Sequence, residues 1–250
     1  MIQALYSAAV AMSAQQSNID TIANNIANLN TSGFKSTRAD FADALYSQMP
    51  HTIQSQNNQH LGHGVTVQSL HRDLSAGPMI STGSPLGLMI DGEGYFTVSD
   101  GAGGRLYTRD GAFATSEHNG AMYLTSGDGL YVLDNNGQRI ALPNGTDGLT
   151  VDSAGVITQD GATIATLGLA GFTNPAGLQS VGANRYAATA ASGAATAAAT
   201  QVLQGYQEGS NVDMAEQITR LIRAQKAYSI LARAISTADS MESTAAGIGR

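Results

Sequence analysis

Two heptad repeats at opposite ends of the chain constrain its fold more than any other feature of the sequence. Near the N-terminus, one series recurs every seven residues and a second lies between its members, so that the spacings alternate between four and three. The two series are Leu5, Met12, Ile19 and Ile26, and Met1, Ala8, Gln15, Ile22 and Leu29. This spacing is typical of a helix that packs along a narrow stripe on another helix. We therefore expect a helix over residues 2–30.

The C-terminal repeat has the same form. One series consists of Met214, Leu221, Tyr228 and Ile235, and a second of Ile218, Gln225 and Ala232. A capping box can begin this helix, either from Asp213 and Glu216 or from Ser210 and Asp213. The pattern predicts a helix from about residue 212 to 244, which we expect to pair with the N-terminal helix in a coiled-coil-like module.

Between the helices the sequence changes character, because residues 62–182 hold 23 of the 29 glycines. Short apolar runs alternate there with Asp-Gly and Asn-Gly pairs, which favour tight hairpin turns. Such pairs begin, among other positions, at Asp91, Asp110, Asp128, Asn136, Asn144, Asp147 and Asp160. No helical period interrupts the runs, which argues against a parallel sheet. The middle of the chain therefore predicts an antiparallel β domain.

The expected fold class is α+β, with long terminal helices paired as one module and an all-β domain inserted between them. We assign residues 1–46 and 201–250 to the discontinuous helix module and residues 71–186 to the β domain. Residues 47–70 are expected to form a polar connector or extension. Residues 187–200, rich in Ala, Thr, Ser and Gly, are expected to be an extended return linker.

Composition excludes several classes of protein. The net charge is −7 with only 12 Lys and Arg, so no basic stripe is available for nucleic acid. Cysteine is absent, which excludes disulfides and thiol catalysis. No apolar run is long enough to cross a membrane. The N-terminus lacks the basic region of a cleavable signal peptide.

No catalytic or metal-binding constellation stands out. Four histidines fall at positions 51–71, but no carboxylate of suitable spacing accompanies them, and surface histidines are the favoured interpretation. The segment DNNGQ at 134–138 lacks the alternating ligands and the downstream Glu of a calcium loop. We therefore expect no enzyme activity, no cofactor and no metal.

Three separated blocks of the sequence resemble a known family. Residues 17–46, SNIDTIANNIANLNTSGFKSTRADFADALY, resemble the N-terminal signature of the bacterial flagellar axial proteins, the rod and hook family. Residues 205–241 resemble the family's C-terminal helix, and IDGEGYFTV, YTRDGAF and DGLYVL resemble the core of its β domain. The length leaves no room for the additional β domain of hook proteins. Within the family, the chain is most similar to distal rod members, with proximal rod or hook-type proteins as alternatives.

The resemblance implies a structural subunit of the flagellar basal body, exported without a cleaved signal. It implies that the terminal helices polymerise around a central channel and that the β domain lies outside them. The implied partners are copies of the chain, other rod and hook proteins, and surrounding ring proteins, with no nucleic acid and no membrane insertion. A rival interpretation is a coiled-coil-tethered adhesin or carbohydrate-binding β domain, and a β-domain hydrolase is disfavoured.

The residues expected to serve polymerisation and helix packing come from both ends of the chain. We interpret Asn24, Asn25 and Asn28 as polar contacts to neighbouring subunits or to the channel, or alternatively as a solvated helix face. The Ser-Gly-Phe that follows is expected to turn the chain out of the helical layer, because Gly suits a residue with positive φ. The full set is Leu5, Met12, Ile19, Ile22, Asn24, Asn25, Ile26, Asn28, Leu29, Gly33, Phe34, Met214, Ile218, Leu221, Gln225, Tyr228 and Ile235.

Overall fold

The computed structural model describes residues 2–44, 46–48, 60–62, 64–101, 103–198 and 200–248. The chain divides into two compact units. The helical unit comprises Met1–Ala27, Thr37–Asp73 and Asp213–Arg250, and the β unit comprises Asn28–Ser36 and Leu74–Val212. Both units are therefore discontinuous in sequence, and the chain passes between them four times.

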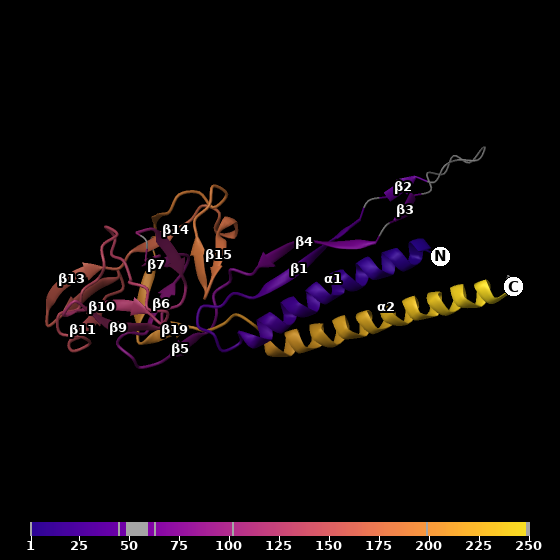
Figure 1. Ribbon diagram of the computed structural model, residues 1–250. Helices are drawn as coiled ribbons and strands as arrows, with labels where there is room; N and C mark the ends of the chain where they lie inside the picture. Colours follow the sequence, from indigo (N-terminus) through magenta and orange to yellow (C-terminus); the bar gives the residue numbers. More distant parts are fainter. Residues whose placement is uncertain are drawn as a thin grey trace. The chain divides into compact units, whose positions relative to one another are not determined.

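Two long helices form the spine of the helical unit. Helix α1 spans Ile2–Ala27 and helix α2 spans Met214–Ile248; they lie side by side and antiparallel, so that the two termini are at the same end of the pair (Figure 1). Asp213 caps α2 as expected, because its Oδ1 accepts the backbone N–H of Glu216 at 3.0 Å. Neither helix is long and apolar enough to cross a membrane.

A hairpin packs along α1 and completes the helical unit. Strand β1 (Thr37–Asp43) pairs antiparallel with β4 (Val65–Arg72), and β2 (Tyr46–Gln48) pairs with β3 (His60–Gly62) (Figure 1). Residues 47–70 were expected to form a polar connector or extension, and these strands correct that expectation in part. Residues 49–59 and His63 of that connector, and the side chain of His60, lie outside the described residues.

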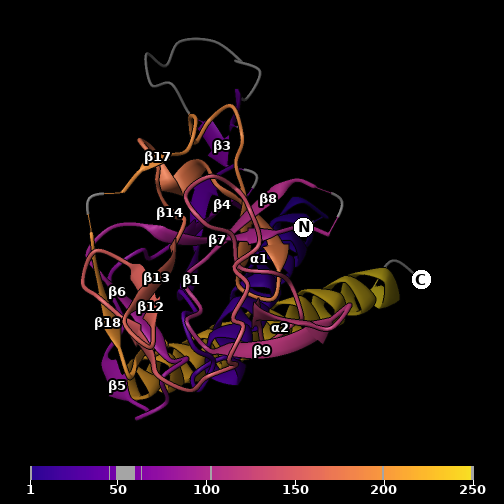
Figure 2. The same ribbon diagram turned by 90° about the vertical axis from the view of Figure 1, so that its left-hand side faces the viewer.

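The β unit is entirely antiparallel, as the Asp-Gly and Asn-Gly pairs predicted. Its largest sheet has six strands in the order β15-β16-β8-β7-β14-β17, and a three-stranded sheet has the order β11-β12-β13. Figure 2 labels β7, β8, β14 and β17 of the first sheet and β12 and β13 of the second. The remaining pairs are β9 with β10, β6 with β18 and β5 with β19. The strands are β5 (Met79–Ser81), β6 (Leu88–Asp91), β7 (Tyr95–Ser99), β8 (Arg105–Thr108), β9 (Phe113–His118), β10 (Ala121–Ser126), β11 (Leu149–Val151), β12 (Val156–Gln159), β13 (Ala162–Thr166), β14 (Leu169–Gly171), β15 (Gln179–Gly182), β16 (Arg185–Ala187), β17 (Thr196–Ala197), β18 (Gln201–Gln204) and β19 (Tyr206–Glu208).

The turn glycines show why the β unit needs its Gly content. In eight of the nine Asp-Gly and Asn-Gly pairs of the chain the glycine has positive φ, which a residue with a side chain rarely adopts. Gly111 is the exception, and there a Cβ atom would overlap the backbone carbonyl oxygen of Leu88. Close approach of two backbones therefore requires that glycine.

Two apolar clusters fill the β unit. The larger surrounds Phe96 and Val98 of β7, which are fully buried, with Leu88, Ile90, Leu124, Leu142 and Ile157 around them. The smaller is aromatic: the rings of Tyr95, Tyr107, Tyr186 and Phe172 meet edge to face, with centroids 4.8–5.9 Å apart. The unit thus has a core of its own, which the helices do not supply.

The boundaries of the two units differ from those expected. Residues 201–212 were assigned to the helix module, but β18 and β19 pair with strands of the β unit, and α2 begins only at Met214. Residues 28–36 also belong to the β unit, since α1 ends at Ala27 rather than near Asn30. The expected linker over 187–200 contains β17, which forms an edge of the six-stranded sheet.

Candidate assembly surface

The face that α2 turns toward α1 follows a heptad spacing. Gln217 and Ala224 are buried there, and Leu221, Tyr228 and Ile235 are half-buried. Three members of the first predicted series are thus half-buried, whereas the fourth, Met214, is exposed. The second is displaced by one residue, because Gln217 and Ala224 occupy the places expected for Ile218 and Gln225, and those two side chains are exposed.

On α1, Ile22 is the buried apolar residue of the packed face, and Leu5, Met12, Ile19 and Ile26 are half-buried. Successive residues of an α-helix are about 100° apart around its axis. The four half-buried residues therefore lie together on one flank of the packed face, to one side of Ile22. The opposite flank carries Ala14, Thr21 and Asn25, on the side where α1 meets the hairpin.

The same geometry identifies an open flank of the helix pair. Ile218 and Ile222 lie on the side of α2 opposite Arg220 and Ala227, which border a groove shared with β1. The side chains of Ile218 and Ile222 are 39% and 47% exposed. The open flank therefore carries Leu5, Met12, Ile19, Ile218 and Ile222 on the side of the helix pair away from the hairpin.

Asn25 joins all three elements of the helical unit. Its side chain is 1% exposed; Nδ2 donates to the Thr37 carbonyl at 2.7 Å and to Gln217 Oε1 at 3.2 Å, and Oδ1 accepts the Thr37 N–H at 2.9 Å. This corrects the interpretation of Asn25 as a contact to a neighbouring subunit or the channel, because its hydrogen-bonding groups are used within the chain. Asn24 is exposed, and Asn28 is half-buried.

Replacing Asn25 by Asp is expected to destabilise the helical unit by about 2 kcal/mol, because the change places a carboxylate against the Thr37 carbonyl and removes two donated hydrogen bonds. Thermal unfolding followed by circular dichroism at the helical wavelength measures the loss. Asn24→Asp, at the exposed neighbouring position, is the matched control. Equal stabilities of the two variants would contradict the role assigned to Asn25.

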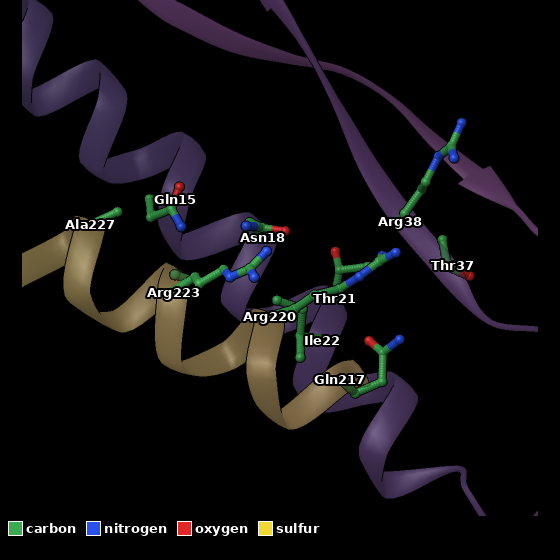
Figure 3. A pocket seen from close by; sticks show the side chains of 11 residues that line it. Gln15, Asn18, Thr21, Ile22, Thr37, Arg38, Gln217, Arg220, Arg223 and Ala227 are labelled. Carbon is green, nitrogen blue, oxygen red and sulfur yellow. The ribbon is translucent and has the colours of Figure 1, made fainter. Parts of the chain in front are cut away.

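A groove of about 320 Å³ lies on the hairpin side of the helix pair (Figure 3). Three arginines border it: Arg220 and Arg223 from α2 and Arg38 from β1. Amide and hydroxyl side chains make up much of the remaining wall: Gln15, Asn18, Thr21, Thr37 and Gln217. The groove is therefore rich in hydrogen-bond donors and carries positive charge.

The Ser-Gly-Phe turn lies in the β unit. Gly33 has φ of +66°, as expected, and its N–H donates to the Glu208 carbonyl at 2.8 Å. A Cβ atom at Gly33 would lie 2.7 Å from the backbone of Arg109 and Asp110, so both its conformation and its close packing require glycine. Leu29 and Phe34 are half-buried.

A buried ion cluster follows directly after this turn. The Lys35 Nζ atom lies 2.5 Å from Glu208 Oε1, and Arg109 Nη1 lies 3.3 Å from Glu208 Oε2. The Gly77 N–H donates to the same Oε1 at 2.9 Å, and Lys35 also donates to the Ser75 carbonyl at 2.6 Å. The Glu208 side chain has no exposed surface. One carboxylate thus joins four chain segments that are distant in sequence.

No pattern in the sequence predicted this ion cluster. Lys35 ends the GFK motif and Glu208 lies in GYQEGSN, but each is a single charge far from the others in the chain. The available signal was that these charged residues lie between apolar or glycine residues in a chain with few charges. Such a position suggests that the charge is buried, but it does not identify the residue that pairs with it.

Two groups near the aromatic cluster have shifted pKa values. Burial raises the pKa of the Asp110 carboxyl above its usual range; the Ala112 N–H, which donates to it at 2.9 Å, opposes the shift, and Asp128 adds to it. Burial also raises the pKa of the Tyr107 hydroxyl, with Arg105 opposing the shift. Among the described residues, no group of three or more His, Cys, Asp or Glu is arranged to hold a metal ion.

Comparison with known families gives three matches in chain order. Residues 5–35 match the family model described as flagella basal body rod protein, and residues 89–159 match the flagellar hook protein FlgE/F/G D1 domain. Residues 203–248 match the flagellar basal body rod FlgEFG protein C-terminal model. The matches thus cover α1, much of the β unit and α2.

Curated relatives match almost the whole chain. The flagellar basal-body rod protein FlgG of Caulobacter vibrioides is 39% identical over 260 residues, covering 96% of this chain and 97% of that protein. FlgG of Agrobacterium fabrum is 37% identical, with 97% of both chains covered, and FlgG of Bacillus subtilis is 35% identical, with 96% of both covered.

Proposed function

The chain belongs to the family of flagellar basal-body rod proteins, of the FlgG type, and is a structural subunit of the rod; from this premise we propose that it polymerises through the helical unit into a hollow helical shaft. In this proposal α1 and α2 form a coiled-coil-like pair that lines the shaft. The proposed partners of the β unit are the surrounding ring proteins.

The open flank of the helix pair is the observation that carries the proposal. Leu5, Met12 and Ile19 are only half covered, and Ile218 and Ile222 remain exposed on the same side. The apolar side chains of the open flank contact water when the chain is alone. An exposed apolar stripe of this kind marks a surface that binds a further partner. A second copy supplies such a partner repeatedly in a helical polymer.

The proposed route to the rod is export without a cleaved signal peptide, followed by assembly with copies of the chain and with other axial proteins. The absence of cysteine is compatible with this route, because folding outside the cytoplasm then requires no disulfide. In the proposed mechanism, α1 and α2 become fully ordered only when neighbouring subunits cover the open flank, since burial there offsets the entropy of ordering.

Electron microscopy of the purified full-length chain tests the proposal. We expect rods or tubes at high protein concentration, and we expect the gene to restore motility to a strain that lacks its own FlgG. Discrete particles at every concentration, together with a failure to restore motility, would refute polymerisation. The adhesin interpretation would instead be supported by glycan binding without any polymer.

A further inference from the structure

The two helices of the pair differ sharply in charge. Helix α1 carries a single charged residue, Asp20, whereas residues 220–233 of α2 carry four basic residues and no acidic one: Arg220, Arg223, Lys226 and Arg233. Among the described residues, only Arg220 of these four forms an ion pair, with Glu216 one turn earlier. The pair therefore presents a basic α2 beside a nearly uncharged α1 with one acidic position.

The groove beside α2 is arranged to receive a carboxylate. Arg220 and Arg223 extend from α2 along the side that faces α1, and Arg38 projects from β1 (Figure 3). Glu216 and Asp40 already neutralise Arg220 and Arg38, respectively, while Arg223 has no ion pair in the part of the chain that the structure describes. Asn18 and Gln15 add amide donors beside it. The groove thus has one uncompensated positive charge.

The chain's own Asp20 cannot occupy its own groove. The groove uses Asn18, Thr21 and Ile22 of α1, and helical geometry places Asp20 on the outer face of the helix, which is opposite. There Asp20 is exposed and accepts a hydrogen bond from Gln16 Nε2 at 2.9 Å. The residues around it on that face are exposed and small, Ser13, Ser17 and Ala23, so another helix can approach closely.

We propose that Asp20 of one copy binds in the arginine groove of a second copy and pairs with Arg223 there. The inference rests on the proposed function and specifies which two surfaces of neighbouring copies meet. The outer face of α1 meets the groove side of α2 in the next copy, so two different surfaces are joined. A two-fold contact of α2 with α2 would instead bring the basic side chains together, and like charges in contact disfavour that arrangement.

A contact between two different surfaces does not close on itself as a two-fold contact does. It continues from copy to copy, and it generates a ring or a helical filament according to the rotation between neighbours. The charge difference between α1 and α2 therefore selects an extended assembly over a dimer. If α1 and α2 carried the same charge, their charges would not favour an extended assembly over a two-fold dimer.

Exchange of the two charges tests the contact. The full-length variants Asp20→Arg and Arg223→Asp are each expected to raise the critical concentration for polymerisation at least about tenfold, because each places like charges in the groove. The double variant, Asp20→Arg with Arg223→Asp, is expected to recover most of the loss. The readouts are the polymerised fraction in sedimentation and the swimming radius of complemented cells.

Two single variants outside the groove are matched controls. Glu242→Arg and Arg233→Asp make the same charge changes on exposed positions of α2 and are expected to shift the critical concentration less than about twofold, as isolated surface charges do. Circular dichroism should show unchanged helix content for all variants, since the positions are exposed. High salt should weaken assembly of the wild type and of the double variant alike.

The outcomes separate this inference from the proposed function. If the wild type polymerises but the Asp20 and Arg223 variants behave like the controls, or the double variant is no better than the single ones, the contact is wrong and polymerisation stands. If the wild type forms no polymer, the proposed function fails and the contact fails with it. Recovery in the double variant alone supports the pairing.

Discussion

Replacement of Glu208 by Ala is expected to lower the free energy of unfolding of the β unit by roughly 3–5 kcal/mol. The variant removes the carboxylate that Lys35 and Arg109 share in the buried cluster and leaves the Gly77 N–H without its acceptor. Removing one partner from a buried ionic group is costly because the remaining charges cannot be solvated. Urea denaturation followed by tyrosine fluorescence measures the change, since the chain contains no Trp.

A second variant separates charge from hydrogen bonding. Glu208→Gln keeps an oxygen acceptor for the Gly77 N–H but removes the negative charge, so its loss should be smaller than that of Glu208→Ala and still well above zero. Glu117→Ala, an exposed position on β9, is the matched control and is expected to change stability by no more than about 0.5 kcal/mol. A Glu208→Gln variant as stable as the wild type would show that the charge is not needed.

Replacement of Ile26 by Asp is expected to abolish polymerisation and leave the β unit folded. Ile26 is half-buried on the flank of α1 that also carries Met12 and Ile19, one turn after the buried Ile22. A carboxylate there must lose its hydration when helices pack around it, and no cation stands beside it on α1. The β unit keeps its own core, so its thermal transition should persist.

Electron microscopy and complementation measure the effect of Ile26→Asp. Ala27→Asp introduces the same charge at the adjacent exposed position and is expected to retain a large share of polymerisation. Motile cells with normal rods that carry Ile26→Asp would contradict the assignment of this face to packing. Loss of the β-unit transition would contradict the independence of the two units.

Local chemistry in the sequence predicted the helices well. The spacing of apolar residues and the Asp213 cap located α2 to within two residues of its observed start. The register of its second series was misplaced because the isoleucine at 218 is more apolar than the glutamine at 217. Where α1 contacts both α2 and the hairpin, its side chains are small or polar. Asn25 of α1 donates a hydrogen bond to Gln217 of α2 there, so Gln217 is buried, whereas Ile218 remains exposed.

Contacts between distant segments explain what the sequence could not predict. The strands of the hairpin alternate only weakly between apolar and polar residues, since Asp40 and His71 interrupt them, and they are stabilised by α1 as well as by each other. Lys35, Arg109 and Glu208 are single charges whose burial depends on the folded arrangement of four segments. Neither pattern has a period that a sequence window can detect.

The position of Glu208 has a mechanical consequence for a structural subunit of a rod. The chain leaves or enters the β unit at residues 28, 36, 74 and 212, and the groups tied to Glu208 lie close to three of these points, at Lys35, Ser75 and Gly77, and at Glu208 itself. A pull on any one of these connections is therefore shared with the others through one carboxylate. A force that would separate a single edge strand from its sheet must here break several charged hydrogen bonds at once. The force is therefore shared by the chain segments that Glu208 joins.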